Sequence, residues 1–140
     1  MPIEQNIELF EASGFSMWPF VRCGDKLIIE QAAAEVLRPG DIVLYEASRQ
    51  KVCHRLIRKV KRNGTYILYM RGDNSFAAPE AVSQEQLVGK ACALIRRDRT
   101  YNLVCWRARG IKYFILIVAP FLSRFVALVV PIYKILRSKV

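Results

Sequence analysis

The sequence has little of the residue types that build metal sites and disulfide scaffolds. It contains one histidine, His54, and four cysteines in 140 residues. The cysteines form no CxxC pair, so their spacing gives no zinc site, and four are too few for a disulfide framework. We therefore expect no metal ion and no cofactor. All four cysteines are expected to be free, small core residues.

Glycine and proline are also scarce, with seven and six residues, whereas 53% of the chain is hydrophobic. This composition excludes a collagen-like chain and a wholly disordered one. A length of 140 residues fits one domain with a core of its own and room for an appendage.

Acidic residues are nearly missing from the last third of the chain. Residues 1–95 carry 12 basic and 11 acidic side chains, but residues 96–140 carry 10 basic residues and one acidic residue, Asp98. The basic residues flank the most apolar segment, an arrangement typical of proteins beside anionic lipid headgroups. A nucleic-acid-binding domain more often spreads its cations over the folded surface, so no nucleic-acid partner is expected.

The apolar segment spans residues 113–133, and 21 helical residues would cover about 30 Å, one bilayer core. Arg124 near its middle costs roughly 3 kcal/mol on insertion scales, and Pro120 and Pro131 would kink a helix. A kinked spanning helix, a shallow re-entrant hairpin and an interfacial helix all stay open. So does a helix buried in the core or in a dimer interface. We interpret residues 107–140 as a membrane-associating tail with lipid as a partner.

The first 15 residues contain three Glu and no apolar core of a signal peptide. A C-terminal anchor alone would leave the N-terminal domain in the cytosol. Because both flanks of the apolar segment are basic, the sequence does not fix the side of the membrane that this domain faces.

Residues 1–106 form a mostly β domain in this interpretation. Residues 3–12 could form a short amphipathic helix, after which the pattern changes to strands. Alternation of apolar and polar residues predicts strands, and Asn63–Gly64 predicts a tight hairpin turn. The expected strands are residues 26–30, 41–47, 52–60, 65–71, 87–96 and 101–106, with a loop at 72–82.

Three positions could carry chemistry, although each has a more ordinary structural interpretation. Ser16 lies in a turn between Gly14 and Pro19, where a hydroxyl can be exposed beside free backbone N–H groups. His54 is a natural general base at neutral pH. Asp73 follows a strand and could orient an imidazole. In the structural interpretation, Ser16 and Asp73 are turn formers and His54 is a half-buried, hydrogen-bonded residue of a strand.

The order of these residues resembles the type I signal peptidase family, part of a wider group of serine proteases that includes self-cleaving repressors. The resemblance covers about residues 13–96. It is carried by the runs Ser16–Met17–Trp18–Pro19, Gly24–Asp25, Gly40–Asp41, His54–Arg55 and Gly72–Asp73–Asn74. The resemblance implies a signal peptidase-like β fold with Ser16 as nucleophile, and a precursor peptide or protein as substrate.

The family uses either Lys in a K-R pair or, in its archaeal and endoplasmic-reticulum kind, His in an H-R pair. This chain has His54–Arg55 at that point and is similar to the Ser/His kind. Lys61 at the hairpin turn is interpreted as solvated charge. Lys51 lies three residues from His54, so in a strand it points to the opposite face.

The chain departs from the family pattern at the third member of the triad. The Asp that usually follows G-D-N is absent, so Asp73 or Glu80 orients His54, or the site works as a dyad. Gly14 replaces a frequent Ser, so backbone N–H groups would form the oxyanion hole. The family's membrane segment usually precedes the catalytic Ser, whereas here the apolar segment is C-terminal.

We therefore predict a membrane-associated serine endopeptidase that trims a precursor or signal-like peptide. The alternatives are a catalytically inactive, membrane-tethered domain that binds peptides or a partner, and a small basic β-barrel that binds nucleic acid. With His54 as base, activity is expected to rise between roughly pH 6 and 8.

Overall fold

The structure is a computed structural model that describes residues 6–104 and 118. These residues form eight strands and one 3-10 turn. Their bounds are β1 Ile7–Glu11, β2 Lys26–Glu30, β3 Ile42–Ala47, β4 Gln50–Arg62, β5 Thr65–Arg71, β6 Glu80–Ser83, η1 Gln84–Gln86, β7 Leu87–Arg96 and β8 Arg99–Asn102.

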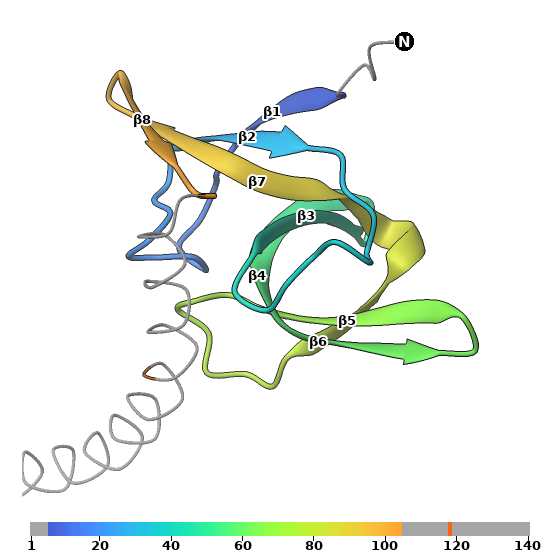
Figure 1. The fold of residues 1–140 in the computed structure, drawn as a ribbon. Coiled ribbons are helices and arrows are strands. Elements are labelled where there is room, and N and C mark those ends of the chain that lie inside the picture. The colour runs from blue at the N-terminus through green and yellow to red at the C-terminus, as the bar shows by residue number, and fades with distance from the viewer. Residues whose placement is uncertain (1–5, 105–117, 119–140) are drawn as a thin grey trace, which may run out of the picture.

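All eight strands belong to one antiparallel sheet that curls into a half-barrel (Figure 1). The strand order is β1-β2-β7-β3-β4-β5-β6, and β8 also pairs with β7. Because β2 occupies one edge of β7, β8 must lie on the same edge as β3, beyond the end of β3. The long strand β7 therefore joins the two halves of the sheet.

Strand β3 lies at the centre of the fold because its first four residues, IVLY, are buried on both faces. Ile42 and Leu44 contribute to one core cluster, which also contains Met17. Val43 and Tyr45 contribute to the second cluster, on the other face of the strand. Neighbouring residues of β3 thus serve different cores, as the two-residue period of a strand requires.

Most of the expected strands are confirmed. β2, β5 and β7 have the predicted bounds, β3 begins one residue later than expected, and β4 extends the predicted strand at both ends. The hairpin turn is present at Asn63 and Gly64, whose φ angles are 49° and 82°. The mostly β fold class is confirmed, and within β4 a bulge after Leu56 interrupts the simple alternation expected over residues 52–60.

Four local predictions are wrong. The segment predicted as helix contains β1, which pairs with β2 and places Phe10 against the core, so sheet pairing overrides the helical pattern. The predicted loop 72–82 contains the start of β6, and the last strand is Arg99–Asn102 instead of residues 101–106. Cys53 is buried as expected, whereas Cys23 is exposed.

The two Gly-Asp pairs close turns in the same way. Gly24 and Gly40 have φ angles of 85° and 92°, which favour glycine. The carboxylate of each following Asp accepts a backbone N–H from three residues earlier, at 2.7 Å for Asp25 and 2.9 Å for Asp41. Each carboxylate also pairs with a cation of β7, so both turns are fixed to the strand that joins the sheet.

The proposed tail lies outside the described residues, apart from residue 118. The boundary at residues 106–107 and the apolar segment 113–133 therefore stay predictions. Within the part of the chain that the structure describes, no helix is both long and apolar enough to cross a bilayer.

Candidate functional site

Ser16 is carried by a loop between β1 and β2 that is closed at its base. The N–H of Ala12 donates to the carbonyl of Asp25 at 2.8 Å, and the N–H of Gly24 donates to the carbonyl of Ala12 at 2.9 Å. Within the loop, Met17 is buried in the core while Ser16 is exposed. The buried Met17 side chain thus anchors the loop, and the adjacent Ser16 is exposed to solvent.

A second segment, at the end of β5, is packed against the backbone of Ser16. The N–H of Asn74 donates to the Ser16 carbonyl at 2.8 Å. A Cβ added to Gly72 would lie 2.5 Å from the same carbonyl oxygen. Only glycine fits this close approach, which explains the Gly of the Gly72–Asp73–Asn74 run.

Asp73 forms an ion pair with Arg55, and both side chains are buried, with exposed fractions of 4% and 1%. The guanidinium donates through Nε and Nη2 to the two carboxylate oxygens, at 2.7 Å and 2.6 Å. It also donates to the Gly40 carbonyl at 2.7 Å and lies 5.1 Å from the centre of the Phe20 ring. This two-point geometry fixes the 72–74 segment to β4.

His54, the neighbour of Arg55 on β4, is held by a different set of groups. Its Nδ1 lies 2.9 Å from the hydroxyl oxygen of Tyr45, and that hydroxyl donates to Oε2 of Glu80 at 3.1 Å. The pairing of β3 with β4 puts Val43 opposite His54, so Tyr45 is its diagonal neighbour. Glu80 reaches the same point from the start of β6.

The Tyr45 hydroxyl decides which nitrogen of His54 carries the proton. A tyrosine has one hydroxyl proton, and here it goes to Glu80, whose ionised carboxylate can only accept. The Nδ1–H of His54 must therefore donate to the Tyr45 oxygen. In the neutral imidazole this leaves the lone pair on Nε2, the atom that would accept a proton from a nucleophile.

The surroundings of His54 favour its neutral form. Burial lowers its pKa below the ordinary value, although the carboxylates of Glu80 and Asp73 act in the opposite direction. Burial and the neighbouring Glu80 raise the pKa of Tyr45. The tyrosine is thus a neutral hydrogen-bonding link at physiological pH, and the imidazole beside it is a free base.

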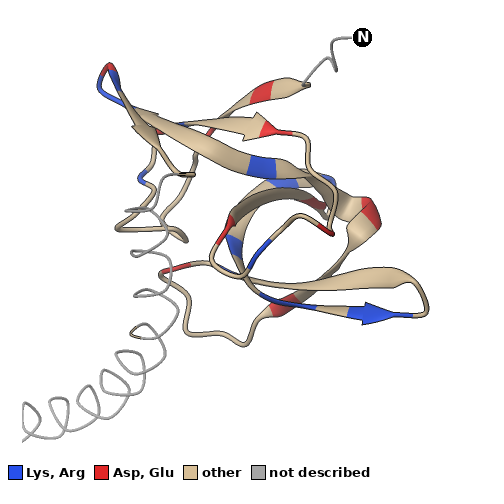
Figure 2. Cartoon of the chain, in the orientation of Figure 1, with Lys and Arg blue, Asp and Glu red and all other residues tan. Residues whose placement is uncertain are grey.

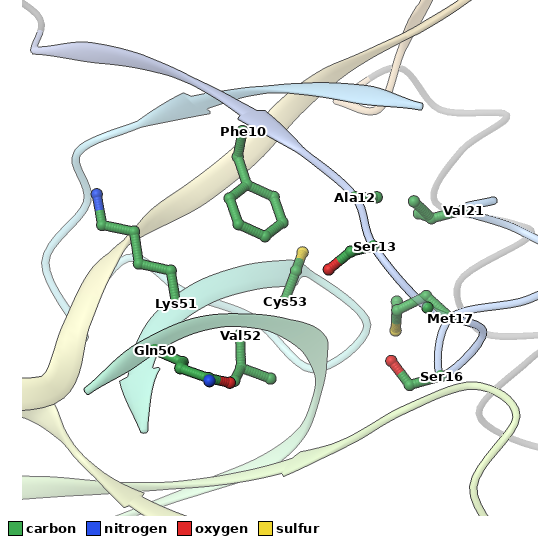
Figure 3. A pocket seen from close by; sticks show the side chains of 11 residues that line it. Phe10, Ala12, Ser13, Ser16, Met17, Val21, Gln50, Lys51, Val52 and Cys53 are labelled. Atoms are coloured by element: carbon green, nitrogen blue, oxygen red, sulfur yellow. The ribbon is translucent and has the colours of Figure 1, made fainter. Parts of the chain in front are cut away.

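A pocket of about 150 Å³ opens beside the Ser16 loop (Figure 3). Ser13, Ser16 and Cys53 all line it, and Figure 3 labels their side chains. Burial raises the pKa of Cys53 to about 12, so this thiol is not a nucleophile at neutral pH. The pocket thus presents two serine hydroxyls, each of which can donate a hydrogen bond.

The lysines near this region are engaged elsewhere. Lys51 also lines the pocket, but its ammonium pairs with Glu8 of β1 at 2.5 Å. The Lys61 ammonium lies over the Tyr66 ring, 5.2 Å from its centre. Neither arrangement offers a free amine as the base.

The structure brings some of the predicted site residues together and separates others. Ser16 and Asp73 belong to adjoining, hydrogen-bonded segments, but Asp73 is committed to Arg55 and makes no hydrogen bond to His54. Glu80, the alternative third member, is connected to His54 through Tyr45. Ser16 and His54 share no hydrogen bond.

Sequence reasoning missed Tyr45 and Ser13. The run DIVLYEA does not show that Tyr45 forms a hydrogen bond to His54, because this contact depends on the register between β3 and β4. Ser13 stands in the same turn as Ser16, and this proximity was the available signal. No protein-family model and no curated protein sequence matches this chain.

Replacement of Asp73 by Asn should lower the free energy of unfolding by about 3–5 kcal/mol, because it leaves the buried Arg55 guanidinium without its counter-charge. Urea unfolding followed by tryptophan fluorescence measures the loss. Glu85→Gln, an exposed carboxylate change, is the control and should cost less than about 0.5 kcal/mol.

The double variant Arg55→Met/Asp73→Leu should recover at least half of that loss, because it leaves no charge buried alone. A single Asp73→Asn variant as stable as the wild-type protein would contradict the structural role assigned to this ion pair.

Proposed function

We propose that this chain is a membrane-associated serine endopeptidase of the signal peptidase type, with Ser16 as nucleophile and His54 as general base. The observation that carries the proposal is the relay from His54 Nδ1 through Tyr45 to Glu80, which leaves Nε2 as the proton acceptor. The curled β domain is compatible with a signal peptidase-like or repressor-protease-like fold. A C-terminal helical membrane segment belongs to the same proposal.

The proposed reaction is acyl transfer to water. Ser16 Oγ attacks a peptide carbonyl while His54 Nε2 takes its proton, and the Tyr45–Glu80 pair stabilises the imidazolium that forms. The imidazolium then protonates the leaving amine, and the acyl-enzyme remains. A water molecule, deprotonated by the same nitrogen, attacks the ester and releases the acid. Glu80 takes the orienting role that Asp73 cannot fill beside Arg55.

The missing Ser16–His54 hydrogen bond is compatible with this chemistry. Hydrogen bonds between nucleophile and base are often long in a free enzyme and tighten when substrate binds. Ser16 is exposed on a loop, whereas His54 is part of the sheet and does not line the pocket beside Ser16, so the proposal requires the two side chains to approach each other when substrate binds.

The substrate is proposed to be a precursor peptide bound beside a membrane. The pocket is small, which favours small side chains near the scissile bond. Phe15 and Trp18 flank the nucleophile on the same loop and are 68% and 50% exposed. Exposed aromatics of this kind suit a membrane surface or an apolar part of the substrate.

The missing Ser16–His54 hydrogen bond also favours a second candidate, a catalytically inactive domain that binds peptides or a partner. It shares the pocket and the membrane tail with the first, but not peptide cleavage. The two candidates differ in whether new protein termini depend on the Ser16 hydroxyl.

Cells that produce the wild-type protein should contain protein N-termini that are missing when Ser16→Ala is produced at the same level. The alanine variant lacks the hydroxyl oxygen that forms the acyl-enzyme in the proposed mechanism. Quantitative mass spectrometry of N-termini in the membrane fraction makes the comparison, and Ser48→Ala, in an exposed turn, is the control.

His54→Ala should lower the rate of the same cleavages by about 10²- to 10⁴-fold. Identical termini from wild type and Ser16→Ala, with both proteins folded and membrane-bound, would move the assignment to the inactive binding domain.

The rate of cleavage should rise with pH to a plateau, with a midpoint below about 6.5, because burial lowers the pKa of His54 and only the neutral imidazole accepts a proton. Glu80→Gln should move this midpoint to lower pH, since it removes a carboxylate that favours the imidazolium. It should also slow the plateau rate by roughly 10- to 100-fold.

Glu85→Gln removes an equal charge outside the relay and should leave the midpoint unchanged. Rates that keep climbing well above pH 8 would exclude His54 as the base, and an unchanged midpoint in Glu80→Gln would exclude the relay.

A further inference from the structure

A second pocket, of about 560 Å³, lies where the β7–β8 hairpin meets the end of the Ser16 loop. It is lined by four arginines and one tyrosine, namely Arg22, Arg96, Arg97, Arg99 and Tyr101. Figure 2 shows basic residues gathered at this hairpin. The pocket shares no lining residue with the pocket beside Ser16.

One of the four arginines is neutralised within the fold. The Arg96 guanidinium donates to both carboxylate oxygens of Asp25, at 2.9 Å and 2.5 Å. Burial raises the pKa of Asp25, but the hydrogen bonds from Arg96 and from the Arg22 backbone, together with the charges of both arginines, outweigh it and keep that pKa below its usual value. Arg96 therefore forms a fixed, charge-balanced wall of the pocket.

The other three arginines are not held in ion pairs within the described fold. Among residues 6–104, Arg22, Arg97 and Arg99 form no ion pair, and all three are exposed. Asp98 stands between two of them in the turn but does not line the pocket. Three cations from two separate segments thus line one space, and the nearby Asp25 carboxylate, which also interacts electrostatically with Arg22, is already paired with Arg96.

We propose that this arginine pocket binds the phosphate of an anionic phospholipid headgroup. Guanidinium groups present forked donors that match phosphate oxygens, and several converging forks can hold one phosphate. Tyr101 adds an amphipathic side chain, 46% exposed, of the kind found at the level of lipid headgroups.

The place of the pocket in the sequence favours a lipid over a soluble phosphate. Val104, two residues after β8, is separated by eight residues from the apolar segment that begins at Tyr113. Three further cations, Arg107, Arg109 and Lys112, stand in that short interval. A headgroup in the pocket would hold the catalytic domain close to the bilayer that the tail is expected to enter.

The test uses the full chain in neutral detergent micelles and a short-chain phosphatidylglycerol as probe. Titration calorimetry should detect binding to the wild-type protein, and Arg97→Gln/Arg99→Gln should weaken it about 30-fold. Each cation beside an anionic lipid surface is worth roughly a factor of five. Ser16→Ala should bind as tightly as the wild-type protein, so the result is independent of the proposed catalysis.

Arg49→Gln/Arg62→Gln is the matched control. Both of its residues are exposed hairpin arginines outside the pocket, and Arg49, like Arg97, has a positive φ angle. If both double variants weakened lipid binding equally, the effect would come from the overall charge of the protein, and the proposed site would be wrong.

Two further probes distinguish the source of the phosphate. Inorganic phosphate that competes at the same concentration as the lipid would point to a soluble ligand and overturn the lipid assignment. An RNA oligonucleotide that binds more tightly than the lipid, through the same two arginines, would overturn it in favour of nucleic acid. Neutral phosphatidylcholine should not compete.

Discussion

The positively charged side chain of Arg55 is almost completely shielded from water, and the ion pair with Asp73 compensates its buried charge. The pair has a geometric consequence. Asp73 lies between Gly72 and Asn74, and both of these residues contact the backbone of Ser16. The same ion pair therefore sets the position of the Ser16 loop relative to β4, the strand that carries His54.

Each of the three Gly-Asp dipeptides of this chain uses its carboxylate to balance a cation on another strand. Asp25 and Asp41 pair with Arg96 and Lys90 of β7, and Asp73 pairs with Arg55 of β4. The runs that suggested a peptidase are thus, in physical terms, turns tied to strands. The carboxylates of these three Gly-Asp pairs thus have a structural role.

Much of the fold could be predicted because strand patterns are local. The runs KLIIE and TYILYMR give strands with the expected bounds, and Asn63–Gly64 gives the turn between two strands. The segment IELFE was predicted as helix but forms a strand, because its pairing partner β2 lies well away in the sequence and local periodicity does not reveal it.

The candidate site was predictable in its residue types but not in its connections. His54 stands out as the only histidine, whereas its orienting partner depends on the register of β3 and on where β6 begins. The sequence also made Asp73 a candidate for that role, but in the structure both of its carboxylate oxygens accept hydrogen bonds from the buried guanidinium of Arg55. Long-range pairing of this kind is set by the assembled sheet.

Because the chain has a single histidine, one spectrum tests whether Tyr45 and Glu80 hold His54 with Nε2 as its proton acceptor. Histidine labelled with ¹⁵N in both ring nitrogens gives distinct shifts for protonated and unprotonated nitrogens at neutral pH. We expect a protonated Nδ1 and an unprotonated Nε2 in the wild-type protein, and loss of this preference in Tyr45→Phe. A protonated Nε2 in the wild-type protein would contradict this arrangement.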